Sequence, residues 1–263
     1  MPETTFTKQS LIAELLKIKN SGWIEIKRNK NNVGNIGNTL EDLLGIEENN
    51  LPIPNASEWE LKTQRKNTSS LLTLFHMEPS PKALSIVPYL LTNFGWRHEK
   101  AGTQYSNDER SFRQTLSYHN PTARGFDLDV DENNRKIVVT LDINKISQNL
   151  TQYRDYLLTN QKDSLDSNHI PYWGFDDLYH KAGIKLTNCF FISADEKSEN
   201  GKKMAKYEDI IMLSKFRIEN FIENIKNKNI YVDFDARTGH NHGTKFRIRP
   251  SAFPLLYENV TYF

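Results

Sequence analysis

Trp59-Glu60-Leu61-Lys62-Thr63 is the expected strand of the most informative stretch of this chain, which begins at Gly34. Its pattern predicts a β-strand, on which successive side chains point to opposite faces. Glu60 and Lys62 should therefore project together, away from the face that holds Leu61. A carboxylate can hold Mg²⁺, and a neighbouring ammonium can orient or activate an attacking water. The segment thus predicts metal-assisted hydrolysis of a phosphodiester.

An acid two residues before a lysine is a common pattern, and this chain repeats it at Glu25-Ile26-Lys27 and Asp195-Glu196-Lys197. A solvated ion pair on a strand edge accounts for most pairs of this kind. The surroundings distinguish the copy at Glu60. A helix start, a polar loop and Pro54-Asn55 precede it, and the hydroxyl-rich run Thr68-Ser69-Ser70 follows it. We therefore place the candidate catalytic site at this copy.

Blocks of sequence through most of the chain stand in an order that matches a known family. They are Gly22-Trp23-x-Glu25-x-Lys27-Arg28, residues 34–44, Glu60-Leu61-Lys62-Thr63, residues 70–75, Tyr172-Trp173-x-Phe175-Asp176, residues 192–197 and His242-Gly243-Thr244-x-Phe246-Arg247-Ile248. In these blocks the chain resembles the MvaI/BcnI group of type II restriction endonucleases. The mismatch-repair nickase MutH is a more distant cousin. The matching order is far more specific than any single block.

The resemblance implies a PD-(D/E)XK nuclease fold, in which a mixed central sheet is flanked by helices and two lobes form a DNA cleft. The alternation of expected strands and helices independently indicates an α/β (α+β) core. We predict one endonuclease domain over residues 1–263. Its catalytic part should lie mainly in residues 1–150 and its DNA-recognition part mainly in residues 151–263.

Hydrophobic periodicity and turn signals predict the order of elements. Helices are expected over residues 11–19, from Thr39 onward with Thr39 as N-cap, and over residues 150–166, 175–185 and 204–228. Strands are expected over residues 23–28, 70–75, 126–130, 136–142, 187–192, 231–235 and 245–249. Residues 78–117 are expected to form a loop-rich insertion that reaches the DNA.

The bulk composition is that of an ordinary globular protein. Charged residues make up 25% of the 263 residues and hydrophobic residues 37%, with a formal net charge of +1. A near-neutral total does not exclude nucleic acid, because basic residues can gather on one face. The single cysteine, Cys189, lies in an apolar run and is expected in the core, in a reducing cytoplasm. The sequence has no apolar run near ~20 residues, so no membrane insertion is expected.

In the family, the catalytic set is a helix glutamate, an aspartate after proline and the glutamate–lysine pair. The resemblance carries these roles to Glu41, position 55, Glu60 and Lys62. Position 55 departs from the pattern, because it holds Asn55. An amide oxygen can ligate Mg²⁺ but is neutral, whereas an aspartate brings a full negative charge. Glu60 and Asn55 are the expected metal ligands, with Lys62 orienting the water and Glu41 supporting the site.

Three explanations of Asn55 are open. The residue is a change introduced to trap an uncut complex, it marks a natural homologue without activity, or another acid compensates. Glu58 is the candidate for compensation, because residues 58, 60 and 62 would share one strand face. We favour an inactivating change.

The expected DNA-reading segment is residues 237–249. Lys245 and Arg247 would share one face of a strand there. The resemblance implies that Arg247 reads guanine, and an arginine can pair with the O6 and N7 atoms of guanine in the major groove. The second guanine-reading arginine of the family aligns with Asp235. Arg237 is expected to replace it after a small shift.

Histidines are further candidates for DNA contact. The spacing of His240 and His242 would suit zinc, but no cysteine or other ligand motif accompanies them, and the family favours a base or phosphate contact. His76 is expected near the centre of the site, with an ordinary polar strand end as the alternative. Phosphate contacts, which position without specifying sequence, are expected from Ser69, Ser70, Lys197, Lys202, Lys203 and Lys206, although a solvated face explains the lysines almost as well.

The resemblance implies a type II restriction endonuclease that binds double-stranded DNA at a short C/G-rich site of the CCNGG kind. It would hydrolyse phosphodiesters with Mg²⁺ by in-line attack of water, leaving a 5′-phosphate. A monomer would cut the two strands one after the other. A cognate DNA methyltransferase is expected as a genetic partner, not a physical one. Two alternatives stay open: a catalytically silent, sequence-specific DNA-binding homologue, and a MutH-like strand nickase.

Overall fold

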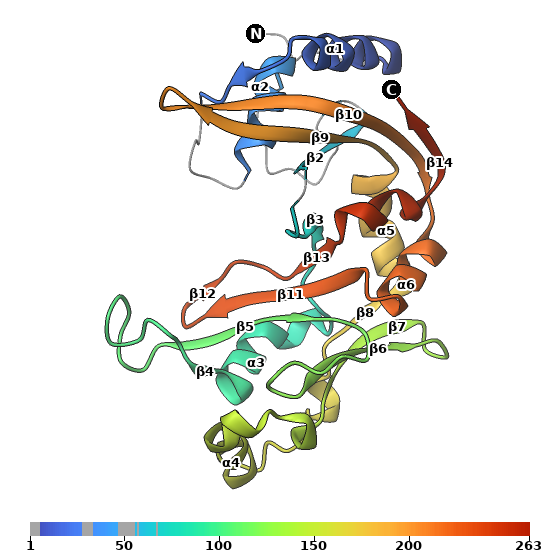
Figure 1. Ribbon diagram of the computed structural model, residues 1–263. Coiled ribbons are helices and arrows are strands. Elements are labelled where there is room, and N and C mark those ends of the chain that lie inside the picture. The colour runs from blue at the N-terminus through green and yellow to red at the C-terminus, as the bar shows by residue number, and fades with distance from the viewer. Residues whose placement is uncertain (1–5, 28–33, 47–55, 57, 67) are drawn as a thin grey trace. The chain divides into compact units, whose positions relative to one another are not determined.

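The computed structural model describes residues 6–27, 34–46, 56, 58–66 and 68–263 (Figure 1). They form two compact units that are interleaved along the chain. The first unit is built from the described parts of residues 1–72 with residues 181–217 and 250–263, and the second from residues 73–180 and 218–249. Each unit therefore draws on both halves of the sequence, and neither coincides with residues 1–150 or 151–263.

The first unit is organised around a five-stranded sheet in the order β1-β10-β9-β2, with β14 also paired to β10. Its strands are β1 (Ile24–Glu25), β2 (Glu60–Arg65), β9 (Asn188–Glu199), β10 (Lys202–Phe216) and β14 (Tyr257–Tyr262). Strand β2 runs parallel to β9, whereas β10 is antiparallel to β9, β1 and β14. The parallel pairing places Glu60 opposite Cys189.

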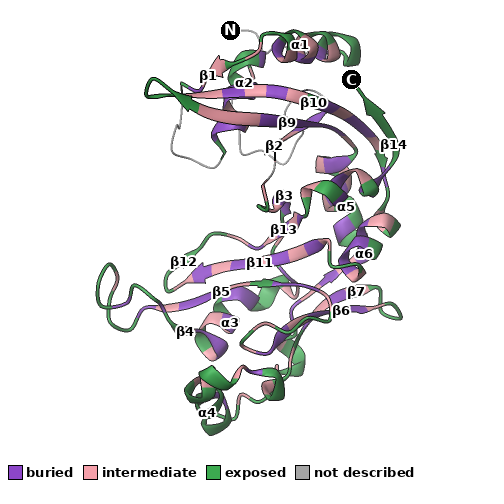
Figure 2. Cartoon of the chain, viewed as in Figure 1, coloured by how far each residue is buried: buried purple, intermediate pink, exposed green. Residues whose placement is uncertain are grey.

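Helices α1 (Lys8–Asn20) and α2 (Asn35–Leu44) bury apolar side chains in the core of the first unit. This core also holds Trp59 and Leu61 beside β2, and Phe190 and Ile192 from β9. Figure 2 shows a continuous buried stretch in β9 and a mixture of buried and more exposed positions along β10. The apolar face of the sheet thus holds the two helices in place.

The start of helix α2 differs from the prediction. The helix begins at Asn35, so Thr39 lies inside it and donates its hydroxyl to the carbonyl of Asn35 at 2.8 Å rather than capping it. Asn35 is fully buried, accepts a hydrogen bond from Arg65 at 2.7 Å and donates to Glu196 at 3.4 Å. These contacts to β2 and β9 anchor the first turn, and sequence-local capping rules cannot anticipate them.

The predicted helix over residues 204–228 is wrong for most of its length. Strand β10 occupies residues up to Phe216, and only α6 (Ile218–Lys226) is helical. The alternation of buried and exposed side chains in β10 is broken by a register shift between Tyr207 and Ile210. This irregularity hides the period of two from sequence inspection, and pairing with β9 decides the structure.

The second unit contains two sheets. One has six strands in the order β3-β13-β11-β5-β4, with β12 paired to β11, and the other has the order β6-β7-β8. The strands are β3 (Leu72–His76), β4 (Trp96–Arg97), β5 (Arg110–Leu116), β6 (Phe126–Asp131), β7 (Lys136–Leu141), β8 (Tyr172–Gly174), β11 (Ile230–Arg237), β12 (His240–Asn241) and β13 (Lys245–Ile248). The predicted hairpin of β6 and β7 is confirmed, with Phe126 opposite Leu141.

Aromatic side chains fill the core of the second unit. Phe112 lies 5.4 Å from Phe234 and 5.2 Å from Phe126 between ring centroids, and Trp173 lies 5.3 Å from Phe246. The helices of this region are α3 (Ile86–Phe94), α4 (Thr151–Thr159), α5 (Phe175–Leu186) and α6. Helix α5 begins in the second unit and ends in the first.

Two further predictions need correction. Residues 78–117 are not a loop-rich insertion, since they supply α3 and β5 to the second unit. The helix expected over residues 150–166 ends at Thr159. Within the described residues, no helix has both the length and the apolar composition needed to cross a bilayer. The mixture of sheets and helices confirms the predicted α/β (α+β) class.

Candidate active site and nucleic-acid interface

Strand β2 brings Glu60 and Lys62 together as the sequence predicts. The Nζ atom of Lys62 lies 2.9 Å from Oε1 of Glu60, which shows that the two side chains share one face. Glu60 is only 4% exposed. On the apolar side, Leu61 is buried in the core of the first unit, and the Trp59 ring lies 4.8 Å from Phe190. A largely buried ion pair therefore lies at the start of a strand that packs against the apolar core of the first unit.

The second oxygen of Glu60 is the unusual feature of this pair. Oε2 is buried and, among the described residues, has no hydrogen-bond partner. The ammonium of Lys185, on the last turn of α5, lies 3.7 Å from this oxygen. A buried charged oxygen without a hydrogen bond is costly. A carboxylate oxygen of this kind is suited to ligate a divalent cation.

Cys189, which is opposite Glu60 in the strand register, and Tyr257 are two neutral groups near this carboxylate. The hydroxyl of Tyr257 lies 3.1 Å from Sγ of Cys189, which is fully buried, as predicted. Burial raises the pKa of the Cys189 thiol to about 12, and burial likewise raises the pKa of Tyr257 well above its usual value. Both groups are therefore uncharged at neutral pH, and Cys189 is a packing residue in this site.

The described residues satisfy only part of a metal site. They contain no group of three or more His, Cys, Asp or Glu side chains that could hold a metal ion. Mg²⁺ keeps several waters and is commonly held by only one or two protein carboxylates, so Glu60 with its second oxygen is compatible with it. Asn55, the other expected ligand, lies outside the described residues.

Glu58 does not continue the face of β2. It lies exposed in a turn between Ala56 and Trp59, which form an isolated bridge, and β2 begins only at Glu60. The period-two argument that placed Glu58 beside Glu60 is therefore wrong, because strand alternation does not extend through a turn. Glu58 as a compensating metal ligand stays a prediction.

Glu41 lies on helix α2, which packs closely against β2. A Cβ atom on Gly37 would lie 3.0 Å from Oγ1 of Thr63, so the helix approaches the strand at that point. Glu41 is one turn further along the helix and shares this face. Helix geometry therefore turns Glu41 toward β2, on the face of the strand that carries Leu61 and Thr63 rather than Glu60 and Lys62. A supporting role of Glu41 stays a prediction.

At the other two copies of the acid–lysine pattern, acidic residues form ion pairs that connect neighbouring parts of the fold. Glu25 forms an ion pair with Lys202 at 3.0 Å across β1 and β10. In the third copy the acid two residues before Lys197 is Asp195, which is half-buried on β9. Its neighbour Glu196 pairs with Arg65 at 2.9 Å and accepts a hydrogen bond from Asn35, which anchors α2. The structure therefore distinguishes the three copies, and only the Glu60 copy is buried.

The DNA-reading candidates Lys245 and Arg247 lie on one face of β13, in the second unit. Lys245 pairs with Asp235 at 3.3 Å, and Arg247 pairs with Asp233 at 3.2 Å. Both aspartates come from the adjacent strand β11, and Phe246 is fully buried on the other face. The aspartates orient the two cations, and sequence analysis missed their role. The alternation of acids along residues 231–235 was the available signal.

Arg237 lies at the end of β11. It pairs with the buried Glu109 at 3.1 Å, and its guanidinium lies 4.6 Å from the ring centroid of Tyr105. On the same strand, Asp235 pairs with Arg113 of β5 at 3.0 Å as well as with Lys245. Ion pairs therefore connect the charged side chains on one face of β5, β11 and β13. We call this face the polar sheet face, and its residues are Arg113, Asp233, Asp235, Arg237, Lys245 and Arg247.

The histidine candidates lie in the same unit. Nε2 of His240 is 3.3 Å from Nδ1 of His242, and both side chains are exposed. His76 is exposed at the end of β3, and a Cβ atom on Gly243 would lie 3.2 Å from its ring. The structure therefore brings His76 beside the turn that carries His242. No zinc-binding group of three ligands occurs among the residues described.

The expected phosphate contacts divide into two kinds. Ser69 and Ser70 are exposed in the loop before β3. The lysines of β9 and β10 are engaged in ion pairs: Lys197 with Glu199 at 2.8 Å, Lys202 with Glu25 at 3.0 Å, Lys203 with Glu196 at 4.0 Å and Lys206 with Glu208 at 2.8 Å. Hydrogen bonds from Lys206 and Lys66 lower the pKa of Glu208 to about 2.

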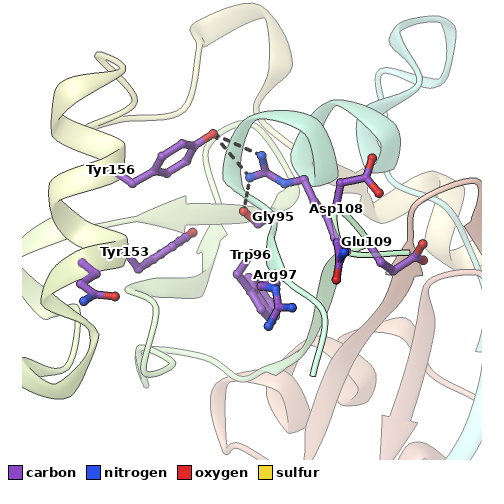
Figure 3. Close-up of a pocket in the computed structure, with 10 residues that line it drawn as sticks. Gly95, Trp96, Arg97, Asp108, Glu109, Tyr153 and Tyr156 are labelled. Carbon is purple, nitrogen blue, oxygen red and sulfur yellow. Dashed lines mark hydrogen bonds between the residues drawn. The ribbon is translucent and has the colours of Figure 1, made fainter. Parts of the chain in front are cut away.

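A cavity of about 530 Å³ lies elsewhere in the second unit (Figure 3). Tyr153 and Tyr156 of α4 line it together with Trp96, whose ring lies 6.4 Å from that of Tyr153 and 5.7 Å from that of Phe112. Phe112 is buried on the side of β5 opposite the exposed Arg113. The cavity is therefore behind the polar sheet face, and none of the predicted site residues lines it.

Known proteins resemble this chain over almost its whole length. The MvaI/BcnI restriction endonuclease family matches residues 12–257. The restriction endonuclease MvaI in complex with its cognate DNA substrate is 26% identical, over 98% of this chain and 99% of that chain, with a TM-score of 0.76. MvaI in the absence of DNA is also 26% identical, over 100% of this chain and 99% of that chain, with a TM-score of 0.56. No curated protein sequence matches the chain.

These matches confirm both the resemblance read from the sequence blocks and the PD-(D/E)XK type of fold. The matched residues include the buried glutamate–lysine pair on β2 and the polar sheet face. The family extends across both compact units, from α1 to the start of β14. The chain therefore belongs to the MvaI/BcnI restriction endonuclease family.

Proposed function

We propose that this chain is a type II restriction endonuclease that binds double-stranded DNA and hydrolyses its phosphodiesters with Mg²⁺. The observation that carries this proposal is the buried pair of Glu60 and Lys62, in which Oε2 of Glu60 has no hydrogen-bond partner among the described residues. A purely structural ion pair would gain from satisfying that oxygen. Membership of the family supports the same chemistry.

The chemistry divides among a few side chains. Glu60 and Asn55 would hold Mg²⁺, which when bound supplies Lewis-acid stabilisation of the charge that develops on the phosphate. Lys62, held at 2.9 Å from Glu60, orients the attacking water by donating a hydrogen bond to its oxygen. Glu41 supports the site from α2. In-line attack then leaves a 5′-phosphate on one product.

The polar sheet face supplies the proposed sequence readout. Arg247 presents a guanidinium that Asp233 already orients, which suits bidentate pairing with guanine O6 and N7. Lys245 and Arg237 lie on the same face, and His76, His240 and His242 are the proposed base or phosphate contacts. Ser69 and Ser70 would contact phosphates. We propose a C/G-rich site of the CCNGG kind, and a solved complex of the similar enzyme MvaI holds its cognate DNA substrate.

Asn55 favours a second candidate function. A neutral amide in place of the family's aspartate weakens metal binding, so the chain would be a catalytically silent, sequence-specific DNA-binding homologue. In either case we expect a monomer in the cytoplasm, with a DNA methyltransferase as its genetic partner. A strand nickase of the MutH kind would instead cut one strand and leave nicked DNA.

The test is plasmid cleavage with Mg²⁺, comparing this chain with its Asn55→Asp variant on a plasmid that carries CCNGG sites. We expect the variant to cut and the unmutated chain to cut far more slowly, because the aspartate restores the missing negative charge. Linear product supports a restriction endonuclease, and persistent nicked circles indicate a nickase.

The other outcomes are equally informative. Equal cutting by both proteins would mean that Glu58 or Glu41 supplies the charge and that Asn55 is not inactivating. No cutting by either, together with salt-sensitive binding to a CCNGG duplex, would support the silent binding homologue. No cutting and no specific binding would contradict both proposals.

A further inference from the structure

The active site contains a second lysine that the family pattern does not include. Lys185 lies on the last turn of α5, and its ammonium is 3.7 Å from Oε2 of Glu60. Lys62 holds the other oxygen of the same carboxylate at 2.9 Å. One buried carboxylate is thus flanked by two ammonium groups, both within the first unit.

The two lysines hold the carboxylate differently. The 2.9 Å contact of Lys62 is a charge-assisted hydrogen bond, whereas 3.7 Å is beyond hydrogen-bond distance. Lys185 therefore neutralises Oε2 by charge alone. It can withdraw from Oε2 without breaking a hydrogen bond to it, because none is formed.

Among the residues that the structure describes, Lys62 and Lys185 form ion pairs with Glu60. Cys189 and Tyr257, which lie beneath it, are neutral because burial raises the pKa of each. The Lys185 side chain is 21% exposed and that of Glu60 is 5% exposed, so the pair is shielded more than a surface ion pair. Its electrostatic effect is accordingly less screened by solvent and salt.

We propose that Lys185 is a positioning residue that neutralises Glu60 in the metal-free protein and weakens the binding of a divalent cation to that carboxylate. This inference rests on the proposed function, in which Glu60 holds the metal. Two ammonium groups on one carboxylate leave a local charge of +1, which repels an incoming cation. Lys185 must give up Oε2 before a cation can use it.

The experiment measures metal affinity rather than cleavage. Mn²⁺ is titrated into the full chain without DNA, and its dissociation constant is measured by calorimetry for the unmutated protein, Lys185→Met and Lys185→Arg. We expect Lys185→Met to bind Mn²⁺ about ten-fold more tightly, as suits the removal of one nearby positive charge from a partly screened site. Lys185→Arg keeps the charge and should stay close to the unmutated protein.

Lys181→Met is the matched control, because it removes the same charge from the same helix one turn earlier. Its Mn²⁺ affinity should be unchanged. Thermal unfolding shows whether each variant is folded, and Lys185→Gln replaces Lys185→Met if the latter unfolds.

Two results would overturn the inference. One is an Mn²⁺ affinity in Lys185→Met that equals or falls below that of Lys181→Met. The other is no Mn²⁺ binding in any variant, since removal of Lys185 would then not have released Glu60. The proposed function is judged separately, by cleavage and specific binding of DNA with the unmutated lysine.

Discussion

At the scale of single residues, burial separates the proposed catalytic pair of Glu60 and Lys62 from the other copies of its sequence pattern. Glu60 and Glu25 both precede a lysine by two positions, but Glu60 is 4% exposed whereas the Glu25 side chain is 28% exposed. The exposed pair of Glu25 with Lys202 is of the kind that contributes about 0–1 kcal/mol to stability. The burial of the acidic residue thus distinguishes the proposed catalytic pair from an ion pair of the same sequence pattern at the surface.

Neutralising Glu60 should slow cleavage strongly, because it removes the proposed metal-holding charge. In the Asn55→Asp background, we expect Glu60→Gln to lower the single-turnover cleavage rate by about 100-fold or more, in the range of effects of positioned acid–base groups. The matched control Glu25→Gln makes the same chemical change in the same pattern and should leave the rate within about two-fold, since an exposed pair contributes little. Equal losses in both variants would contradict the assignment.

At the scale of elements, the packing of α2 on β2 determines where Glu41 lies. The helix is anchored by Asn35 through Arg65 and Glu196, and it approaches the strand closely at Gly37. A Cβ atom at position 37 would require Oγ1 of Thr63 to shift by a few tenths of an ångström, and Thr63 is next to Lys62 on the strand. The register of this contact therefore links the helix to the catalytic strand.

Alanine at Gly37 should be less favourable than alanine at Gly183, although both glycines lie inside helices. A Cβ at position 183 meets no atom within 4 Å, so Gly183→Ala should raise the free energy of unfolding by about 0.5–1 kcal/mol. A Cβ at position 37 would lie 3.0 Å from Oγ1 of Thr63. This crowding should cancel the increase, so Gly37→Ala should not raise the free energy of unfolding. Denaturant unfolding measures both values.

The Thr63→Ala background supplies the control for this contact, because it removes Oγ1. Gly37→Ala should be more favourable in that background than in the unmutated protein. If Gly37→Ala stabilises as much as Gly183→Ala while Thr63 is present, the close approach of α2 to β2 is not a constraint on the fold.

At the scale of the whole molecule, the proposed catalytic pair and the proposed DNA-reading residues belong to different compact units. The pair of Glu60 and Lys62 lies in the first unit, and the polar sheet face lies in the second. Each unit has its own apolar core. Substitutions on the polar sheet face should therefore change DNA affinity without disturbing the catalytic strand.

Arg247→Met should weaken binding to a CCNGG duplex by about five-fold to 160-fold, the effect expected from about 1–3 kcal/mol for a lost bidentate contact to guanine. Binding is measured by fluorescence anisotropy at a fixed salt concentration. Arg154→Met removes an exposed arginine of α4 and should leave specific affinity nearly unchanged. A similar loss on DNA without the site would identify Arg247 as a phosphate contact instead.

The sequence predicted correctly those features that depend on neighbouring residues. The β6–β7 hairpin, the pairing of Glu60 with Lys62 and the burial of Cys189 are all confirmed, because strand alternation and turn residues act over a few positions. The order of the sequence blocks was also sufficient to identify the family.

Only the tertiary structure decided the remaining features, because they depend on residues that are far apart in the chain. Pairing with β9 makes residues 202–216 a strand, and contacts with Arg65 and Glu196 begin α2 at Asn35. Lys185 reaches Glu60 across 125 positions, since α5 leads directly into the strand paired with β2. Short-range patterns carry no information about such contacts, whose partners are set by the packing of the whole unit.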